Sequence, residues 1–173
     1  MTIDRTTDTM SVPTTEAVDN ERVVRRFIDE IFVQGRKETV DELVADDFVA
    51  HTWPSPTGDP KADLKSAIDR AAAGLSDPRF TIDDVIAEGD RVAARLTTSA
   101  TQTGEFMGMP PSGKRYEIEE IHWFRLRDGQ VVEHWHQLDQ LGMMKQLGAM
   151  PGGGAGNGAS GAGAKETATA GSR

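Results

Sequence analysis

The stretch VVEHWHQLDQL, residues 131–141, places two histidines, a tryptophan and an aspartate at the end of an apolar run. His134 and His136 are two positions apart, so in a strand both imidazoles would lie on the same face. Two such side chains could bind a metal ion or could move protons at neutral pH. Asp139 follows closely and could add a carboxylate to either kind of site.

A metal site would need a third ligand, which His51 or His122 could supply, because imidazole suits zinc and iron. The chain has no cysteine, which excludes disulfides, thiolate catalysis and cysteine-based zinc sites. A His-x-His pair alone is a weak motif. We therefore predict that no metal is bound, and the alternative role for His134 and His136 is that of half-exposed strand residues.

An acid–base site would combine a carboxylate in an apolar pocket with a nearby histidine, a pair that can remove a proton next to a carbonyl. Asp139 and His122 fit this, with His136 as a third member. Each has a simpler interpretation: His122 as a core histidine with one hydrogen bond, and Asp139 as the N-cap of a helix. Strand alternation also aims Asp139 away from the two histidines unless the strand ends or bulges before it.

The elements that would position these residues come in two groups. Apolar residues at helical spacing predict helices over 20–35, 37–48 and 60–75, the last opened by Asp59-Pro60. Period-two alternation then predicts two hairpins, one turning at 88–90 and one at Asp128-Gly129, before a short helix at the end. In the strand before Asp128, alternation places one set of side chains inward: Tyr116, Ile118, Glu120, His122, Phe124 and Leu126. Helices followed by an antiparallel meander indicate an α+β fold, with a pocket between helix and bent sheet.

The ends of the chain differ from this middle part. Residues 1–18 are polar and Thr-rich, and residues 150–173 are Gly/Ala-rich, so we predict a flexible N-terminal segment, a domain over 19–149 and a disordered tail. The net charge is −9, from 28 acidic and 19 basic residues, and there is no basic cluster. This argues against nucleic acid or an anionic membrane surface as a partner. The sequence shows no signal peptide or long apolar run, so a cytoplasmic location is expected.

Three stretches together resemble the SnoaL-like polyketide cyclase family of the nuclear transport factor 2-like superfamily. They begin with VVRRFIDEIFVQG, FTIDDVIAEGDRVAARL and IHWFRLRDGQVVEHWHQLDQLG, and they extend over most of residues 20–149. The resemblance implies a cone-shaped α+β barrel with a deep apolar pocket, in a homodimer or larger homo-oligomer. It also implies intramolecular aldol closure, or related enolate chemistry, on a hydrophobic carbonyl compound, without a metal or organic cofactor.

Within this family the resemblance makes Asp139 the general acid/base and His122 its assisting histidine. The residues expected to contact the substrate are His51, Trp53, His134, His136, Phe106, Met107 and Trp123. His136 departs from the small or apolar residue that the family pattern implies at that position. The alternative function is a domain of the same fold that binds a small molecule, or forms oligomers, without catalysis.

Overall fold

This computed structural model describes residues 14–53 and 55–149. Its described residues contain five helical elements, four before β2 and one after β5. Helix α1 (Thr15–Phe27) continues into a π-helical segment, η1 (Ile28–Val33). Helix α2 (Lys37–Leu43) and helix α3 (Pro60–Gly74) follow, and α4 (Gln140–Leu147) closes the described chain. Asp59 caps α3 by accepting a hydrogen bond from the Ala62 backbone N–H at 3.0 Å, as the Asp-Pro pair predicts.

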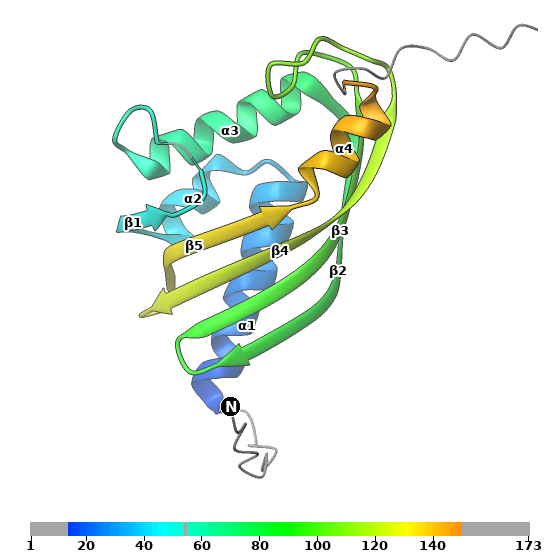
Figure 1. The fold of residues 1–173 in the computed structure, drawn as a ribbon. Helices are drawn as coiled ribbons and strands as arrows, with labels where there is room; N and C mark the ends of the chain where they lie inside the picture. The colour runs from blue at the N-terminus through cyan, green and yellow to red at the C-terminus, as the bar shows by residue number, and fades with distance from the viewer. Residues whose placement is uncertain (1–13, 54, 150–173) are drawn as a thin grey trace, which may run out of the picture.

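The sheet has five strands in the order β1-β5-β4-β3-β2. Their bounds are β1 Val44–Ala50, β2 Leu75–Glu88, β3 Arg91–Gln102, β4 Arg115–Arg127 and β5 Gln130–Leu138. Strands β2 to β5 pair antiparallel, whereas β1 pairs parallel to β5. The long strands curve around α1, and α4 packs against β4 (Figure 1).

The two predicted hairpins are confirmed, and so is the short last helix. The second helix was predicted to run over 37–48, but this is wrong after Leu43, because residues 44–50 form β1 on β5. The sheet is therefore mixed and open, not a purely antiparallel meander. Helix α1 starts at Thr15, inside the segment predicted to be flexible, because Thr14 caps it. Residues 1–13 and the predicted tail, 150–173, lie outside the described residues.

The buried core is divided into two clusters. The larger one joins α1, η1, α2 and α3 to the sheet, and its largest fully buried side chains include Phe27 and Phe124. The smaller one joins the far ends of β3 and β4 to α4 and consists of Ala100, Tyr116, Ile118, Met143 and Leu147. The inner faces of β4 and β5 run from one cluster to the other and carry polar side chains between them. Within the described residues, no helix is both long and apolar enough to cross a membrane.

Candidate active site

Adjacent strands β4 and β5 bring four polar side chains together on the inner face of the sheet. His122 pairs with His136 across the two strands, and Phe124 pairs with His134 one step further along. Alternation along β4 adds Glu120 to the same face, as the sequence predicts. His122 and His134 are each 1% exposed, and Glu120 is 8% exposed. His136 is partly buried. Polar groups buried to this extent require hydrogen-bond partners, which they find in one another.

The Glu120 carboxylate is the centre of this cluster. Its Oε2 atom lies 3.1 Å from Nε2 of His122 and 3.1 Å from Nε2 of His136. On the other side of the His122 ring, Nδ1 lies 3.0 Å from Nε2 of His134. Three imidazoles and one carboxylate therefore form a single hydrogen-bonded chain across β4 and β5.

Trp53, in the loop after β1, fixes the direction of these hydrogen bonds. Its indole Nε1–H donates to Nδ1 of His136 at 3.0 Å, and an indole nitrogen can only donate. Nδ1 of a neutral His136 is therefore an acceptor, and its proton lies on Nε2, from which it is donated to Glu120. By the same reasoning a neutral His122 donates from Nε2 to Glu120 and accepts at Nδ1 from His134.

Burial and hydrogen bonding set the charges in the cluster. Burial alone would raise the pKa of Glu120, but the hydrogen bonds from His122 and His136 outweigh it and lower the pKa to about 2. Burial lowers the pKa of His122, and it lowers that of His134 well below the usual value. Near neutral pH the Glu120 carboxylate is thus ionised, and the buried imidazoles of His122 and His134 are neutral.

Aromatic side chains surround the cluster and exclude water from it. The Phe32 ring from η1 lies 5.5 Å from the His122 ring, centroid to centroid, and the Trp53 ring lies 5.8 Å from that of His136 in an edge-on arrangement. Trp53 also packs edge-on against His134 at 5.4 Å. In such apolar surroundings a charge or a hydrogen bond has a larger electrostatic effect than in water.

Glu120, His122 and His136 are the described residues that could hold a metal ion, since their ligand atoms all lie within 4.8 Å of one another. The hydrogen-bond direction works against this. The Trp53 N–H requires a proton on Nε2 of His136, and a protonated nitrogen cannot be a ligand. As arranged here, the cluster is better suited to proton transfer than to metal binding.

The predicted carboxylate, Asp139, lies elsewhere. It is exposed and serves as the N-cap of α4, accepting a hydrogen bond from the Gly142 backbone N–H at 2.8 Å. Its neighbours around a cleft of about 260 Å³ include Arg95, Glu119 and Ile121, from the outer face of the sheet. The expectation that Asp139 shares a pocket with His122 is therefore wrong, and the capping interpretation is confirmed.

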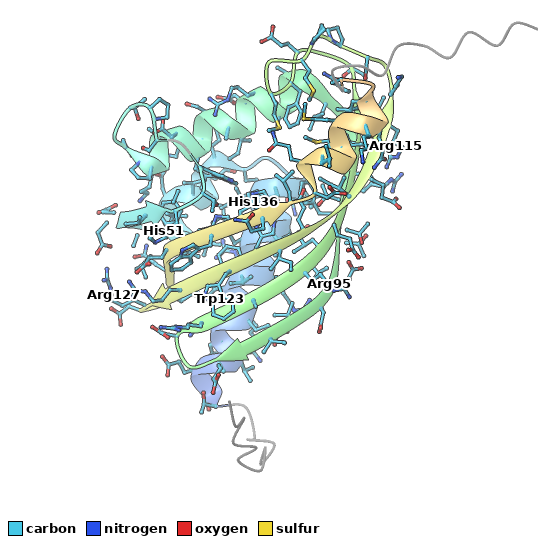
Figure 2. The ribbon with its side chains drawn as sticks, in the orientation of Figure 1. His51, Arg95, Arg115, Trp123, Arg127 and His136 are labelled. Atoms are coloured by element: carbon cyan, nitrogen blue, oxygen red, sulfur yellow. The ribbon has the colours of Figure 1, made fainter. Side chains whose placement is uncertain are left out.

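Two predicted substrate contacts also lie on the outer face. His51 stacks on Trp135, with ring centroids 4.2 Å apart, and its Nε2 lies 2.8 Å from the Glu133 carboxylate. Trp123, labelled in Figure 2, is 42% exposed. It alternates along β4 with the buried His122. Strand alternation excludes Trp123 from the side of the sheet that carries the histidine cluster, and stacking on Trp135 excludes His51. The sequence pattern of β4 could have placed Trp123 correctly.

Phe106 and Met107 lie in the crossing between β3 and β4. Phe106 packs on the smaller core cluster, and Met107 is 53% exposed. Neither belongs to the histidine cluster. Two clefts of the described residues lie away from it, one beside Asp139 and one at the start of α1, and none of the cluster histidines lines either of them. The expected deep pocket next to the histidines is thus not among these clefts.

Glu120 is the functional candidate that the sequence prediction left out of the catalytic set. Alternation had placed it on the inner face two residues from His122, and a carboxylate among buried positions is a signal in itself. What the sequence could not show was that β5 places His136 against the same oxygen. That contact depends on the register between β4 and β5.

Known proteins resemble this chain along most of its length. The family model for SnoaL-like polyketide cyclases matches residues 22–147. The aklanonic acid methyl ester cyclase DnrD of Streptomyces peucetius is 38% identical over 60 residues, 35% of this chain and 41% of the relative, so this match spans about two fifths of that protein. The nogalonic acid methyl ester cyclase of Streptomyces nogalater is 27% identical over 125 residues, 68% of this chain and 89% of the relative.

Solved structures share the fold of this chain. The structure of TsrD from Streptomyces laurentii superimposes with a TM-score of 0.70 at 29% identity, covering 79% of this chain and all of TsrD. The helices and the curved open sheet are those of the nuclear transport factor 2-like fold, which confirms the α+β prediction. Since the family model covers most of the described residues, the chain belongs to the SnoaL-like polyketide cyclase family.

Proposed function

We propose that this protein is a cofactor-independent cyclase that closes a ring by intramolecular aldol addition in a hydrophobic carbonyl compound. The observation that supports this best is the hydrogen-bonded chain Trp53–His136–Glu120. A carboxylate that holds one imidazole nitrogen leaves the other as a base, the arrangement of a catalytic dyad. In this proposal His136 takes the role first expected of Asp139.

The reaction would begin where Trp53 and His136 meet. A substrate that enters between them would present an α C–H to Nδ1 of His136 and its carbonyl oxygen to the Trp53 N–H. The C–H bond breaks, the proton goes to Nδ1, and the electron pair forms an enolate whose oxygen accepts the Trp53 hydrogen bond. The Glu120 carboxylate stabilises the resulting His136 imidazolium by accepting a hydrogen bond from the imidazolium Nε2–H.

Ring closure follows within the same molecule. The enolate carbon attacks a second carbonyl, a C–C bond forms, and the displaced C=O electron pair resides on oxygen. The His136 imidazolium returns its proton to that oxygen, which becomes a hydroxyl. The product is an isomer of the substrate, so the reaction needs no oxidant, reductant or co-reactant. His122 would keep Glu120 ionised through its own hydrogen bond.

The names of the relatives suggest a substrate class. Two of them are cyclases of aklanonic acid methyl ester and nogalonic acid methyl ester. We propose that the substrate of this chain is likewise the methyl ester of a polyketide acid. A cytoplasmic location is a further part of the proposal.

The test is incubation of the purified protein with each of these two esters, followed by chromatography with mass detection for a product of unchanged mass. We expect His136→Gln to lower turnover by about 10²- to 10⁴-fold, the usual contribution of a general base. His51→Gln, on the outer face, is the matched control and should retain wild-type turnover. Full activity of a folded His136→Gln variant would contradict the mechanism. Binding of an ester by the wild type without any product would favour the non-catalytic alternative.

We also propose that the outer face of the sheet is covered by a second copy of the chain. Ile121 and Trp123 are 53% and 42% exposed there, which is unusual for large apolar side chains on a monomer. Charges of both signs lie on the same face, such as Arg95 with Glu119 at 3.7 Å. A mixed face of this kind can pair with itself about a two-fold axis.

A further inference from the structure

The buried carboxylate of Glu120 has no lysine or arginine partner among residues 14–53 and 55–149. Its ion-pair contacts within these ranges are with His122 and His136, at 3.1 Å each, and its side chain is 9% exposed. A buried charge in a protein is normally paired with an opposite charge or coordinates a metal ion. The Glu120 carboxylate therefore retains the capacity to bind a cation.

The donor atoms around this carboxylate suit a transition-metal ion. Nε2 of His122 and Nε2 of His136 face the same Glu120 oxygen, and the three ligand atoms lie within 4.8 Å of one another. Two imidazoles and one carboxylate are a common ligand set for zinc and for non-haem iron. Magnesium and calcium, in contrast, prefer oxygen ligands alone.

His122 already has the second hydrogen bond that a metal-bound imidazole needs. Such a ring usually donates its other N–H to an acceptor, which fixes its orientation. Nδ1 of His122 lies 3.0 Å from Nε2 of His134, which can accept that proton once His134 carries its own proton on Nδ1. Each ring then keeps one proton and only changes the nitrogen that holds it.

His136 is held in the opposite arrangement by Trp53. Binding a metal through Nε2 would place the His136 proton on Nδ1, toward which the Trp53 N–H already points from 3.0 Å. Two N–H groups would then face each other, so an ion can bind only after this hydrogen bond breaks. The indole N–H loses its acceptor, and this loss should lower the affinity for an ion by about 5-fold to 150-fold.

We propose that Glu120, His122 and His136 form a latent site for a divalent transition-metal ion, and that Trp53 controls the affinity of this site. The indole N–H makes the cluster select protons over metal ions. An ion on Nε2 of His136 would take the place of the proton through which Glu120 holds this ring. That the protected ring acts as a base rests on the proposed function, whereas the metal site does not.

The test is zinc binding measured by isothermal titration calorimetry at pH 7, with untagged protein that has been freed of metal by a chelator. Trp53→Phe removes the N–H and keeps an aromatic ring. Trp123→Phe, the same change on the outer face, is the matched control. We expect Trp53→Phe to bind one Zn²⁺ per chain about 5-fold to 150-fold more tightly than the wild type. Trp123→Phe should match the wild type, and a wild type without measurable binding would make this ratio a lower limit.

A second substitution identifies the ligands. Adding His136→Gln to Trp53→Phe should abolish the tight zinc binding, because one of the three ligands is lost. Melting temperatures measured without metal show whether each variant is folded. Trp53→Leu also lacks the N–H and replaces Trp53→Phe if the phenylalanine variant does not fold.

Two results would overturn the proposal. One is a zinc affinity of Trp53→Phe equal to that of the wild type, including no binding by either protein. The other is tight zinc binding that survives the loss of His136. Because these are binding measurements, they are independent of turnover. Tight zinc binding by Trp53→Phe alongside a fully active His136→Gln would keep the metal site and refute the catalytic role of His136.

Discussion

Replacing Glu120 by glutamine should destabilise the protein at neutral pH and make it less sensitive to acid. The carboxylate is 8% exposed and accepts hydrogen bonds from both His122 and His136. Its pKa falls from 4.5 to about 2 on folding. A glutamine keeps the shape but has no charge, so both hydrogen bonds lose their charge-assisted strength.

The way stability depends on pH follows from the lowered pKa of Glu120. A carboxyl group whose pKa is lower in the folded state stabilises the protein above its unfolded pKa, and this stability is lost as the pH falls toward the folded pKa. A shift of this size corresponds to about 3 kcal/mol at pH 7. About 2 kcal/mol of that is lost between pH 5 and pH 3. His122 and His134 also reduce the stability of the fold as the pH falls, in a higher pH range than Glu120, because their lowered pKa values oppose protonation of the folded state.

The assay is urea unfolding of wild type and Glu120→Gln at pH 7, 5 and 3. The difference between the two free energies of unfolding isolates Glu120 from the other carboxyl groups. It should be about 3 kcal/mol at pH 7 and should shrink by about 2 kcal/mol between pH 5 and pH 3. Glu119→Gln, whose side chain is 76% exposed on the outer face, is the matched control and should show no such trend. A difference for Glu120→Gln that stays constant with pH would refute the assignment of a buried, ionised carboxylate.

Further predictions concern the cap, the indole and the outer face. Asp139→Asn should retain turnover and stability, because asparagine also caps helices. Gly142→Ala should lower the free energy of unfolding by about 1 kcal/mol, because a Cβ there would overlap the Asp139 carboxylate. A large loss of turnover in Asp139→Asn with an intact fold would restore Asp139 as the base. Trp53→Phe should lower turnover and change the pH profile, because it frees Nδ1 of His136 and removes the donor for the enolate oxygen; an unchanged pH profile would contradict the role of the indole. Trp123→Arg should shift the mass measured by light scattering toward that of the monomer and leave the histidine cluster intact, and an unchanged mass would exclude this face as the interface.

Much of the fold could be predicted because its signals are local. The Asp59 cap and the Asp128-Gly129 turn each depend on a few adjacent residues, and both form as expected. Strand β1 could not be predicted in this way. Its apolar residues fit a helix as well as a strand over so short a stretch, and what decides between them is pairing with β5, about 85 residues further along the chain.

In the candidate site, too, local patterns could be predicted and contacts between distant segments could not. Alternation along β4 correctly placed His122 and Glu120 inward and would also have excluded Trp123. It also raised the conflict over Asp139, which the structure resolves by ending β5 at Leu138 and starting a helix. The contacts that define the site join Glu120, His136 and Trp53 from three separate segments. No local pattern contains information about such contacts.

The hydrogen bond between Trp53 and His136 closes the site, and this closure is a basis for selectivity. The Trp53 N–H and Nδ1 of His136 satisfy each other, so opening the site leaves a partly buried donor and a partly buried acceptor unpaired. Only a ligand that offers an acceptor to the indole and an acidic hydrogen to the imidazole replaces both interactions. A carbonyl compound with an α C–H has these two groups on adjacent atoms, whereas a hydrocarbon has neither. The site should therefore discriminate against apolar molecules without a carbonyl, even though aromatic side chains surround it.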